Sequence, residues 1–351
     1  MERYIGIDVH LQSCTVAVMG PSGQHLRLQV VPTLGADLVE MIRSVRGRRL
    51  VCLEEGTQSE WLYELLSPHA GRVIVTVPAK RRGSKSDAVD AWALADRLRR
   101  GDLEIQVFKA PHQCGALRAA VRGHLWLTRD LTRIKCRLRA LARSRGLQVG
   151  AALYDPEQRL PWLQQLPPRL EPLGALLGAE HDAVAKLQAQ AEKALLTESR
   201  PHRAVRLLQT MPGIGPVRAA QLVAVLVTPA RFRSKRQLWS YCGLGIVTSV
   251  TAEWGFRDGK PTRQAAIQTR GLTRQRHPLL KNIFKGAAHT IVTQLPQQPL
   301  AQQFQRQVAA GTKPNLALLT LARRLAAIAL SLWKHEEEYD PAKHGVVTTV
   351  E

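Results

Sequence analysis

The chain has 351 residues, with 50 lysines and arginines against 28 aspartates and glutamates, a formal charge of +22. Hydrophobic residues make up 45% of it, enough for a core in each of about two domains, which excludes wholesale disorder. A pI near 10.6 disfavours most small-molecule enzymes and favours a partner of dense negative charge, first of all nucleic acid.

Other classes are excluded by what the sequence lacks. No uninterrupted apolar run reaches the length of a transmembrane helix, and the opening MERYIGIDVH is not typical of a signal peptide, so no membrane partner is expected. The cysteines are scattered and form no CxxC pair, which indicates neither a disulfide framework nor a structural zinc site. We therefore predict a cytoplasmic protein. The cysteines are Cys14, Cys52, Cys114, Cys136 and Cys242.

The first hundred residues read as strands and helices in the order β-β-β-α-β-α-β-α. The predicted strands are 3–9, 13–19, 25–31, 49–54 and 72–77, and the predicted helices are 35–45, 58–66 and 86–100. This order indicates a mixed sheet with helices on its faces. A basic loop precedes the third helix, and we expect it to contact nucleic acid through Lys80, Arg81, Arg82 and Lys85.

Long helical segments follow at 113–145 and 174–197, separated by a proline-rich stretch. The first has nine basic residues and one acid, Asp130, with a rough apolar stripe. Two such helices predict an antiparallel hairpin or a dimerising coiled coil. The predicted domains are 1–105, a helical linker 106–200, a mainly helical domain 201–340 and a tail 341–351.

Charge is concentrated near the end of the chain. Residues 201–335 hold 20 basic residues and 2 acids, which is typical of a surface that follows phosphates; a solvated face without a partner is the alternative. The last strong helix is predicted at 312–335. We expect a basic loop region over 257–277, running into a helix with two lysines.

Five carboxylates of the first domain lie where strands end or a helix begins. Asp8 ends the first strand, Glu54 and Glu55 end the fourth, and Asp87 and Asp90 share one face of the third helix. Clustered carboxylates repel unless cations occupy the site, and hard oxygen ligands suit Mg²⁺ or Mn²⁺. A pair of such ions stabilises both oxygens of a phosphodiester transfer.

Each acid also has an ordinary explanation. An aspartate after a strand is often a turn residue, and Asp90 alone fits a solvated face. Ser84 to Asp87 fits a helix capping box, with Ser84 as the cap. Adjacent strand residues point to opposite sides, so only one of Glu54 and Glu55 is expected to reach a site.

Glycines and basic residues mark the later domain. Gly213 and Gly215 precede the apolar helix VRAAQLVAVL, and such a turn lets backbone N–H groups approach a phosphate. It looks like a helix-hairpin-helix clamp; a plain helical turn is the alternative.

Phe232 and Trp239 are expected in the core. The remaining expected nucleic-acid contacts are Arg233, Lys235, Arg236, Arg270, Arg274, Lys281 and Lys285.

The segments IGIDVH, CLEEGTQSEWLYELL and KSDAVDAWALADRL together resemble the DEDD transposases of bacterial insertion sequences. The resemblance continues through MPGIGPVRAAQLVA and FRSKRQLWSYCGLGIV to about residue 335. It implies an α/β RNase H-like (RuvC-like) first domain, with Mg²⁺ held by Asp8, Glu54, Asp87 and Asp90. Glu55 is the alternative to Glu54, because EEGT is longer than the common form with a single glutamate.

The resemblance also implies a serine nucleophile after the GLG segment, a structured guide RNA, donor and target DNA, and a dimer or tetramer. The usual serine-rich run falls near Val250 and Thr251 here. Ser249 is the predicted nucleophile and Thr251 the alternative. The rival functions are a metal-dependent junction nuclease, which needs no Ser249, and an inactive nucleic-acid-binding relative.

Overall fold

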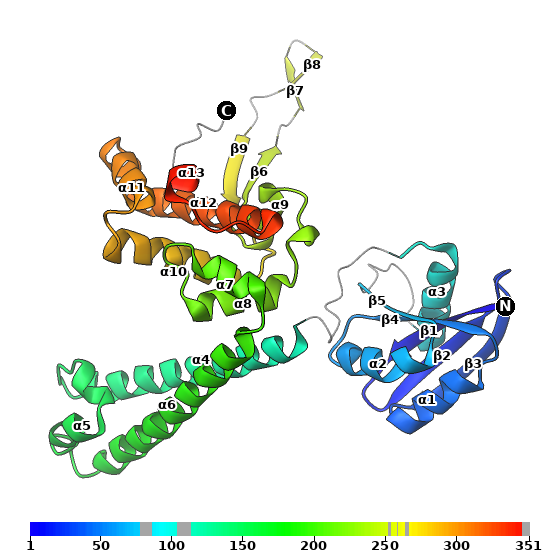
Figure 1. The fold of residues 1–351 in the computed structure, drawn as a ribbon, viewed down its shortest axis with the longest axis horizontal. Coiled ribbons are helices and arrows are strands. Elements are labelled where there is room, and N and C mark those ends of the chain that lie inside the picture. Colours follow the sequence, from blue (N-terminus) through cyan, green and yellow to red (C-terminus); the bar gives the residue numbers. More distant parts are fainter. Residues whose placement is uncertain (78–85, 104–113, 252–253, 258, 264–266, 346–351) are drawn as a thin grey trace. The chain divides into compact units, whose positions relative to one another are not determined.

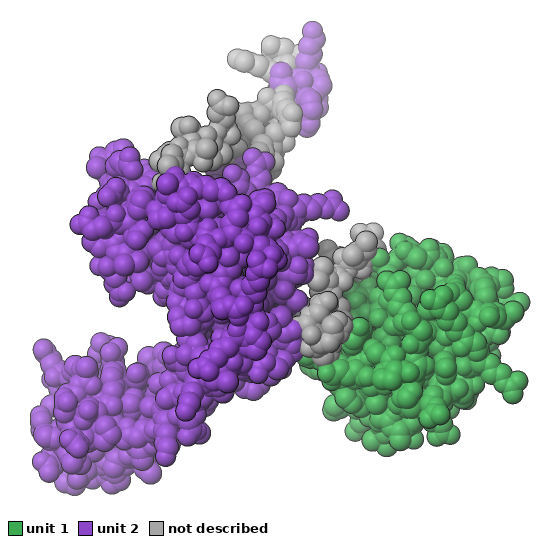
Figure 2. Space-filling model, viewed as in Figure 1, with its two compact units in different colours: residues 1–113 green, residues 114–351 purple. Residues whose placement is uncertain are grey.

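The computed structural model describes residues 1–77, 86–103, 114–251, 254–257, 259–263 and 267–345. The chain forms two compact units, residues 1–113 and residues 114–351 (Figures 1 and 2). The predicted basic loop with Lys80, Arg81, Arg82 and Lys85 lies outside the described residues. The predicted helical linker belongs to the same unit as the later helices, and its independence as a domain stays a prediction.

Unit 1 is built on a five-stranded sheet in the order β3-β2-β1-β4-β5. The central strand β1 pairs antiparallel with β2 and parallel with β4, and β4 pairs parallel with β5. All eight predicted elements are present, so the mixed sheet is confirmed. They are β1 (Glu2–Val9), β2 (Ser13–Met19), β3 (His25–Pro32), α1 (Gly35–Ser44), β4 (Arg48–Glu54), α2 (Ser59–Leu66), β5 (Arg72–Thr76) and α3 (Asp87–Arg100), with a short 3-10 turn, η1 (Ser67–His69).

Helices cover both faces of this sheet. Successive strand residues point to opposite faces, so Ile5 and Ile7 belong to one face while Gly6 and Asp8 belong to the other. The isoleucine face packs against Leu38 of α1 and other residues of α1 and α2. The opposite face packs against α3 through Cys52, Leu94 and Leu98. Asp8 therefore points to the side of the sheet that carries α3.

Gly6 allows α3 to lie very close to β1. A Cβ atom at this position would clash with the backbone oxygen of Ala91 and lie 2.6 Å from the backbone nitrogen of Ala95. A backbone atom of a helix cannot turn aside as a flexible side chain can. Any larger residue would therefore push α3, with Asp87 and Asp90, away from the strand that carries Asp8.

Unit 2 begins with a helical hairpin. Helices α4 (Gly115–Arg143) and α6 (Glu171–Ser199) lie side by side and are joined through η2 (Ala151–Tyr154) and α5 (Pro156–Leu163) (Figure 1). Ile134, Leu138 and Trp162 are among the buried residues near the tip. The antiparallel hairpin is thus confirmed within the chain, and association through it stays a prediction.

The remaining helices pack around one core, which includes Phe284, Leu325 and residues of α8. Phe232 is buried and Trp239 is half-buried against this core, as expected; Trp239 Nε1 donates to the backbone oxygen of Arg323 at 2.7 Å. The helices are α7 (Arg203–Gln209), α8 (Pro216–Leu226), α9 (Lys235–Tyr241), α10 (Pro278–Gln294), α11 (Pro299–Ala309), α12 (Pro314–His335) and α13 (Pro341–Gly345), with a 3-10 turn η3 (Pro229–Arg231).

Two small β ribbons replace the basic loop region predicted over 257–277. β6 (Ile246–Thr251) pairs antiparallel with β9 (Ile267–Leu272), and β7 (Trp254–Arg257) pairs with β8 (Lys260–Arg263). They extend from the helical part (Figure 1). The prediction of a loop was wrong because a ribbon with no core face lacks the apolar alternation that marks a strand. The β-branched run Ile246–Thr251 was the available signal.

Helix α12 is long and apolar enough to cross a membrane by length and composition alone. Half of its most apolar window is buried inside the protein, where Ala322, Leu325 and Ala326 are fully covered. These contacts are those of a core helix.

Candidate active site and nucleic-acid interface

Asp8 and Asp87 come together where β1 ends and α3 begins. Asp8 is the second-last residue of β1 and Asp87 the first residue of α3, with extended Ser86 at the N-cap. The helix therefore starts later than the predicted capping box requires, and that prediction is wrong: Asp87 is not three residues beyond the cap. A carboxylate in the first turn is stabilised by the helix dipole.

His10 joins these two carboxylates. Its Nε2 atom lies 3.3 Å from Asp8 Oδ2 and 3.3 Å from Asp87 Oδ1. One ligand atom from each of the three residues lies within 4.8 Å of the other two. The side chains are 15% exposed for Asp8, 41% for His10 and 53% for Asp87, so the group is open to solvent on the helix side. Sequence reasoning missed His10, although it follows Asp8 by two residues.

This group fits a divalent cation. Carboxylate oxygens and a neutral imidazole nitrogen are ligands for Mn²⁺ and other divalent ions, while Mg²⁺ prefers oxygen. Asp8 Oδ2 and His10 Nε2 are buried atoms that have no hydrogen-bond partner among the described residues, although they face each other. A bound cation would satisfy both atoms at once.

Glu54 and Asp90 lie on neighbouring elements, outside the three-residue group. Glu54 ends β4, which runs parallel to β1. Its side chain is half-buried and points to the same face of the sheet as that of Cys52, two residues earlier, which is the face that carries α3. Asp90 is buried, with 7% exposure, one turn along α3 from Asp87. Glu55 is exposed beyond the end of the strand, where its backbone N–H donates to Thr76 at 2.7 Å. The direction of its side chain favours Glu54 over Glu55 as the candidate site residue.

The glycine turn lies between α7 and α8. Gly213 has a φ of +74°, and a Cβ there would lie 2.6 Å from the backbone oxygen of Ala287 in α10. Gly215 is the exposed N-cap of α8, with open space around the position of a Cβ. Arg218 Nη1 donates to the Gly213 oxygen at 2.6 Å. The turn is therefore held against α10 on one side, while the N-terminus of α8 is open on the other.

Ser249 lies in the middle of β6, where its backbone is paired with Thr269 of β9. Thr251 ends the same strand, opposite Ile267. Ser249 therefore has a regular strand backbone. Burial raises the pKa of the Cys242 thiol to about 12, which excludes this cysteine as a nucleophile near neutral pH.

The predicted basic residues lie on several elements of unit 2. Arg233 precedes α9, while Lys235 and Arg236 start it, and all three are exposed. Arg270 and Arg274 are exposed on and after β9. Lys281 and Lys285 are one turn apart on α10. Partial burial, and then repulsion from Arg276 and Lys285, lowers the pKa of Lys281. This cationic cluster would be stabilised by an anion.

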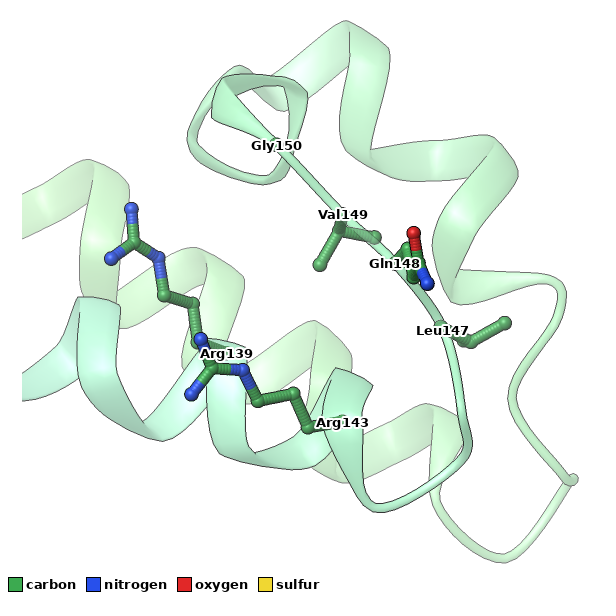
Figure 3. A pocket seen from close by; sticks show the side chains of 6 residues that line it. All are labelled: Arg139, Arg143, Leu147, Gln148, Val149 and Gly150. Atoms are coloured by element: carbon green, nitrogen blue, oxygen red, sulfur yellow. The ribbon is translucent and has the colours of Figure 1, made fainter.

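Another basic pocket lies at the tip of the helical hairpin. Arg139 and Arg143 extend from α4 opposite the backbone of residues 147–150, around a cavity of about 480 Å³ (Figure 3). Arg139 also lies 5.4 Å from the centre of the Tyr154 ring. This pocket, lined by two arginines and by main chain, adds to the basic surface of unit 2.

Comparisons with known proteins identify the family of this chain. Residues 5–144 match the DEDD transposase family of IS110, and residues 205–297 match the family described as "Transposase IS116/IS110/IS902 family". Together the matches span about two thirds of the chain. A protein of Sinorhizobium fredii named "Putative transposase y4pF/y4sB" is 26% identical over 277 residues, 78% of this chain and 68% of that protein.

Two matches to transposase families place this chain, with its mixed sheet and basic helical unit, among enzymes that act on nucleic acid. The family matches make it specific: the chain belongs to the IS110 family of insertion-sequence transposases. It is therefore a DNA recombinase, as the sequence predicted.

Proposed function

We propose that this transposase cuts and rejoins DNA strands by metal-dependent transesterification, with Asp8, Glu54, Asp87 and Asp90 holding Mg²⁺ or Mn²⁺. The single observation that carries the proposal is the meeting of Asp8, His10 and Asp87 at the end of β1. The strand order β3-β2-β1-β4-β5, with three antiparallel strands followed by two parallel ones, supports an RNase H-like fold of the RuvC type.

The bound ions would supply Lewis-acid stabilisation of the attacking and leaving oxygens. The chain's own task is to hold the ligands at a fixed spacing. Asp8 is held by a strand paired on both sides, and Asp87 and Asp90 by a helix seated on the sheet at Gly6. Sites on such elements are more precisely positioned than sites on loops.

Ser249 is the proposed nucleophile, with Thr251 as the alternative. Its Oγ atom would form an ester bond with a DNA phosphorus, lose its proton to solvent and release one DNA oxygen as a free hydroxyl. Attack by a hydroxyl of another strand would reverse the step and free Ser249. A threonine hydroxyl is more hindered by its branched Cβ, which favours Ser249.

The substrates would be donor and target DNA paired with a structured guide RNA. The open N-terminus of α8 at Gly215 and the exposed arginines around α9 support contacts to phosphates, in the manner of a helix-hairpin-helix. If RNA pairing supplies specificity, the protein needs few side chains that read bases. Strand exchange needs two duplexes, so we propose a dimer or tetramer acting in the cytoplasm.

The test is a cleavage assay with the co-expressed flanking RNA, Mg²⁺ and labelled donor and target DNA, resolved on denaturing gels. Wild type, Ser249→Ala, Thr251→Ala and Asp87→Ala are compared. We expect a slow-migrating, protease-sensitive protein–DNA band that is absent from Ser249→Ala. Its absence from Thr251→Ala alone would move the nucleophile to Thr251.

The same gels separate the rival functions. Free cut ends with no adduct, abolished only by Asp87→Ala, would establish a metal-dependent junction nuclease and overturn the serine mechanism. Retained binding with no cleavage in the wild type, at any Mg²⁺ or Mn²⁺ concentration, would identify an inactive binding relative.

A further inference from the structure

A cavity of about 590 Å³ lies at the base of the β6–β9 ribbon. Its lining comes from η3, from α9 and from the segment that follows β9, and it includes Arg231, Gln237, Tyr241, Gln275, Arg276 and His277. Backbone hydrogen bonds join the two flanks of the ribbon, from Thr273 to Gly245 at 3.0 Å and from His277 to Tyr241 at 2.9 Å. The cavity is thus formed by segments that are fixed to each other.

Planar groups make up one wall of the cavity. The Tyr241 ring lies 5.6 Å from the Phe232 ring and 6.0 Å from the His277 ring, centre to centre. The guanidinium of Arg231 lies over both Phe232 and Tyr241, at 5.5 and 5.2 Å from the ring centres. Its Nη1 atom donates to the backbone oxygen of Leu226 at 3.1 Å, which holds the arginine in place.

Positive charge lines the same cavity without compensation. Neither Arg231 nor Arg276 is paired with a carboxylate among the described residues. The stem of Arg276 packs directly against the backbone at Gly243, which directs its charged end. Arg276 also helps to lower the pKa of Lys281, so the two cations are close enough to repel each other.

Two carboxamides complete the lining. The Gln237 oxygen accepts a hydrogen bond from the backbone N–H of Arg233 at 2.7 Å, which fixes the side chain while its NH₂ group offers further hydrogens. Gln275 is exposed at the rim. A carboxamide can both donate to and accept from the edge of a nucleobase.

We propose that this cavity binds one unpaired nucleotide of the nucleic-acid substrate. The base would stack among Tyr241, His277 and the Arg231 guanidinium, and its phosphate would contact Arg276 and Lys281. A phosphate alone would not use the rings, and an apolar peptide would not use the uncompensated arginines. Unstacked bases are recognised by such a combination of aromatic faces, guanidinium planes and amides.

The position of the cavity gives the nucleotide a role. Tyr241 and Gln275 flank the ribbon whose strand β6 carries Ser249, three residues beyond Ile246 at the ribbon base. At about 3.3 Å per strand residue, Ser249 is roughly 10 Å along the ribbon from its base. A nucleotide held in the cavity would fix the strand next to the phosphodiester proposed to react. Nucleotide binding in the cavity does not depend on the proposed function. Only the statement that the reacting phosphodiester lies next to the bound nucleotide rests on the proposed function.

The test compares affinities for a duplex with one bulged nucleotide and for the same duplex fully paired, by fluorescence anisotropy with the full-length protein. Parallel arms use all-DNA and all-RNA duplexes, which distinguish the source of the nucleotide. We expect the wild type to bind a bulged duplex of at least one polymer roughly tenfold more tightly, the scale of one stacked base. Tyr241→Leu should bring the ratio close to one, and Tyr241→Phe should keep most of it.

A matched pair tests the charge. Arg276→Gln keeps the stem that packs on Gly243 and should lower the bulge preference several-fold. Arg306→Gln removes one charge from the exposed surface of α11 and should weaken both duplexes equally, leaving the ratio unchanged. Thermal unfolding of each variant verifies that it folds.

The outcomes separate this inference from the proposed chemistry. A wild-type ratio of one with both polymers, or a ratio that Tyr241→Leu does not change, overturns the nucleotide site. If the serine–DNA adduct still forms in that case, the recombinase mechanism stands alone. A bulge preference lost in Tyr241→Leu, without any adduct in the wild type, would instead retain the cavity and reject the serine mechanism.

Discussion

The acidic group of unit 1 and the ribbon of unit 2 differ in how firmly they are held. Asp8 lies on a strand paired on both sides and covered by helices on both faces, so this proposed ligand is positioned before any substrate binds. Ser249 lies on a two-stranded ribbon, an arrangement that is only marginally stable on its own in water. The proposed metal-binding half is therefore preformed, whereas the position of the proposed nucleophile depends on what the ribbon contacts.

The largest effect is expected from a substitution in the acidic group of unit 1. Asp87→Ala should reduce DNA strand cleavage by about a thousandfold or more, because several kcal/mol of transition-state stabilisation would depend on the proposed ions. DNA binding, measured by anisotropy, should change little, since most of the excess positive charge lies in residues 201–335, in unit 2. The matched control is Asp96→Ala on the same helix, where the carboxylate pairs with Arg99 and Arg100. Equal losses in both variants would remove Asp87 from the site.

The next prediction concerns the adjacent glutamates. Glu54→Gln should reduce cleavage about a hundredfold or more, because the Glu54 side chain points to the face of the sheet that carries α3. Glu55→Gln should leave cleavage near the wild-type level. Mn²⁺ affinity of both variants, measured by electron paramagnetic resonance, gives a readout independent of activity. The opposite order of effects would assign the metal site to Glu55.

Sequence reasoning succeeded where burial imposes a pattern. The strands of unit 1 alternate or are wholly apolar, and all five were predicted close to their observed bounds. It missed His10, since one histidine after a strand has no periodic signal. It also missed Tyr241 as a candidate contact. The proximity of Tyr241 and Arg276 was not predicted, because it depends on pairing between segments more than thirty residues apart. The strands of the exposed ribbons were missed because they have no buried face.

A third prediction separates structure from binding at the glycine turn. Gly213→Ala should destabilise unit 2 by about 2 kcal/mol, because φ is positive there and the new Cβ would press on α10. Gly215→Ala should change stability by less than about 0.5 kcal/mol, since the space around it is open. Urea unfolding measures both. Weaker binding of duplex DNA by Gly215→Ala at unchanged stability would support the phosphate clamp; unchanged binding would reduce the motif to a helical turn.

A smaller loss of stability than that of Gly213→Ala is expected in the hairpin. Arg159 is buried and donates to both oxygens of Asp182, at 2.9 and 2.6 Å. These hydrogen bonds, and then one from His181, lower the pKa of Asp182. Because the Asp182 side chain is 36% exposed, solvent screening reduces the benefit, and Asp182→Asn should cost about 1 kcal/mol.

The pH dependence of this pair has a definite sign. A carboxyl whose pKa is lowered on folding contributes stability above its unfolded value, near 4, and loses it as the pH falls through the lower folded value. The difference in unfolding free energy between wild type and Asp182→Asn should therefore be complete at pH 7 and shrink below about pH 4. A constant difference across this range would show that the effect is not ionic.

The contact at Gly6 also bears on the proposed metal site of this transposase. Helix α3 can approach β1 only because position 6 lacks a side chain, and the separation of Asp8 from Asp87 follows from that approach. In the proposed metal site, the spacing of Asp8 and Asp87 thus depends on a position that is not itself a proposed ligand. Retuning the site toward a larger cation would begin with the volume of residue 6, leaving every ligand in the sequence unchanged.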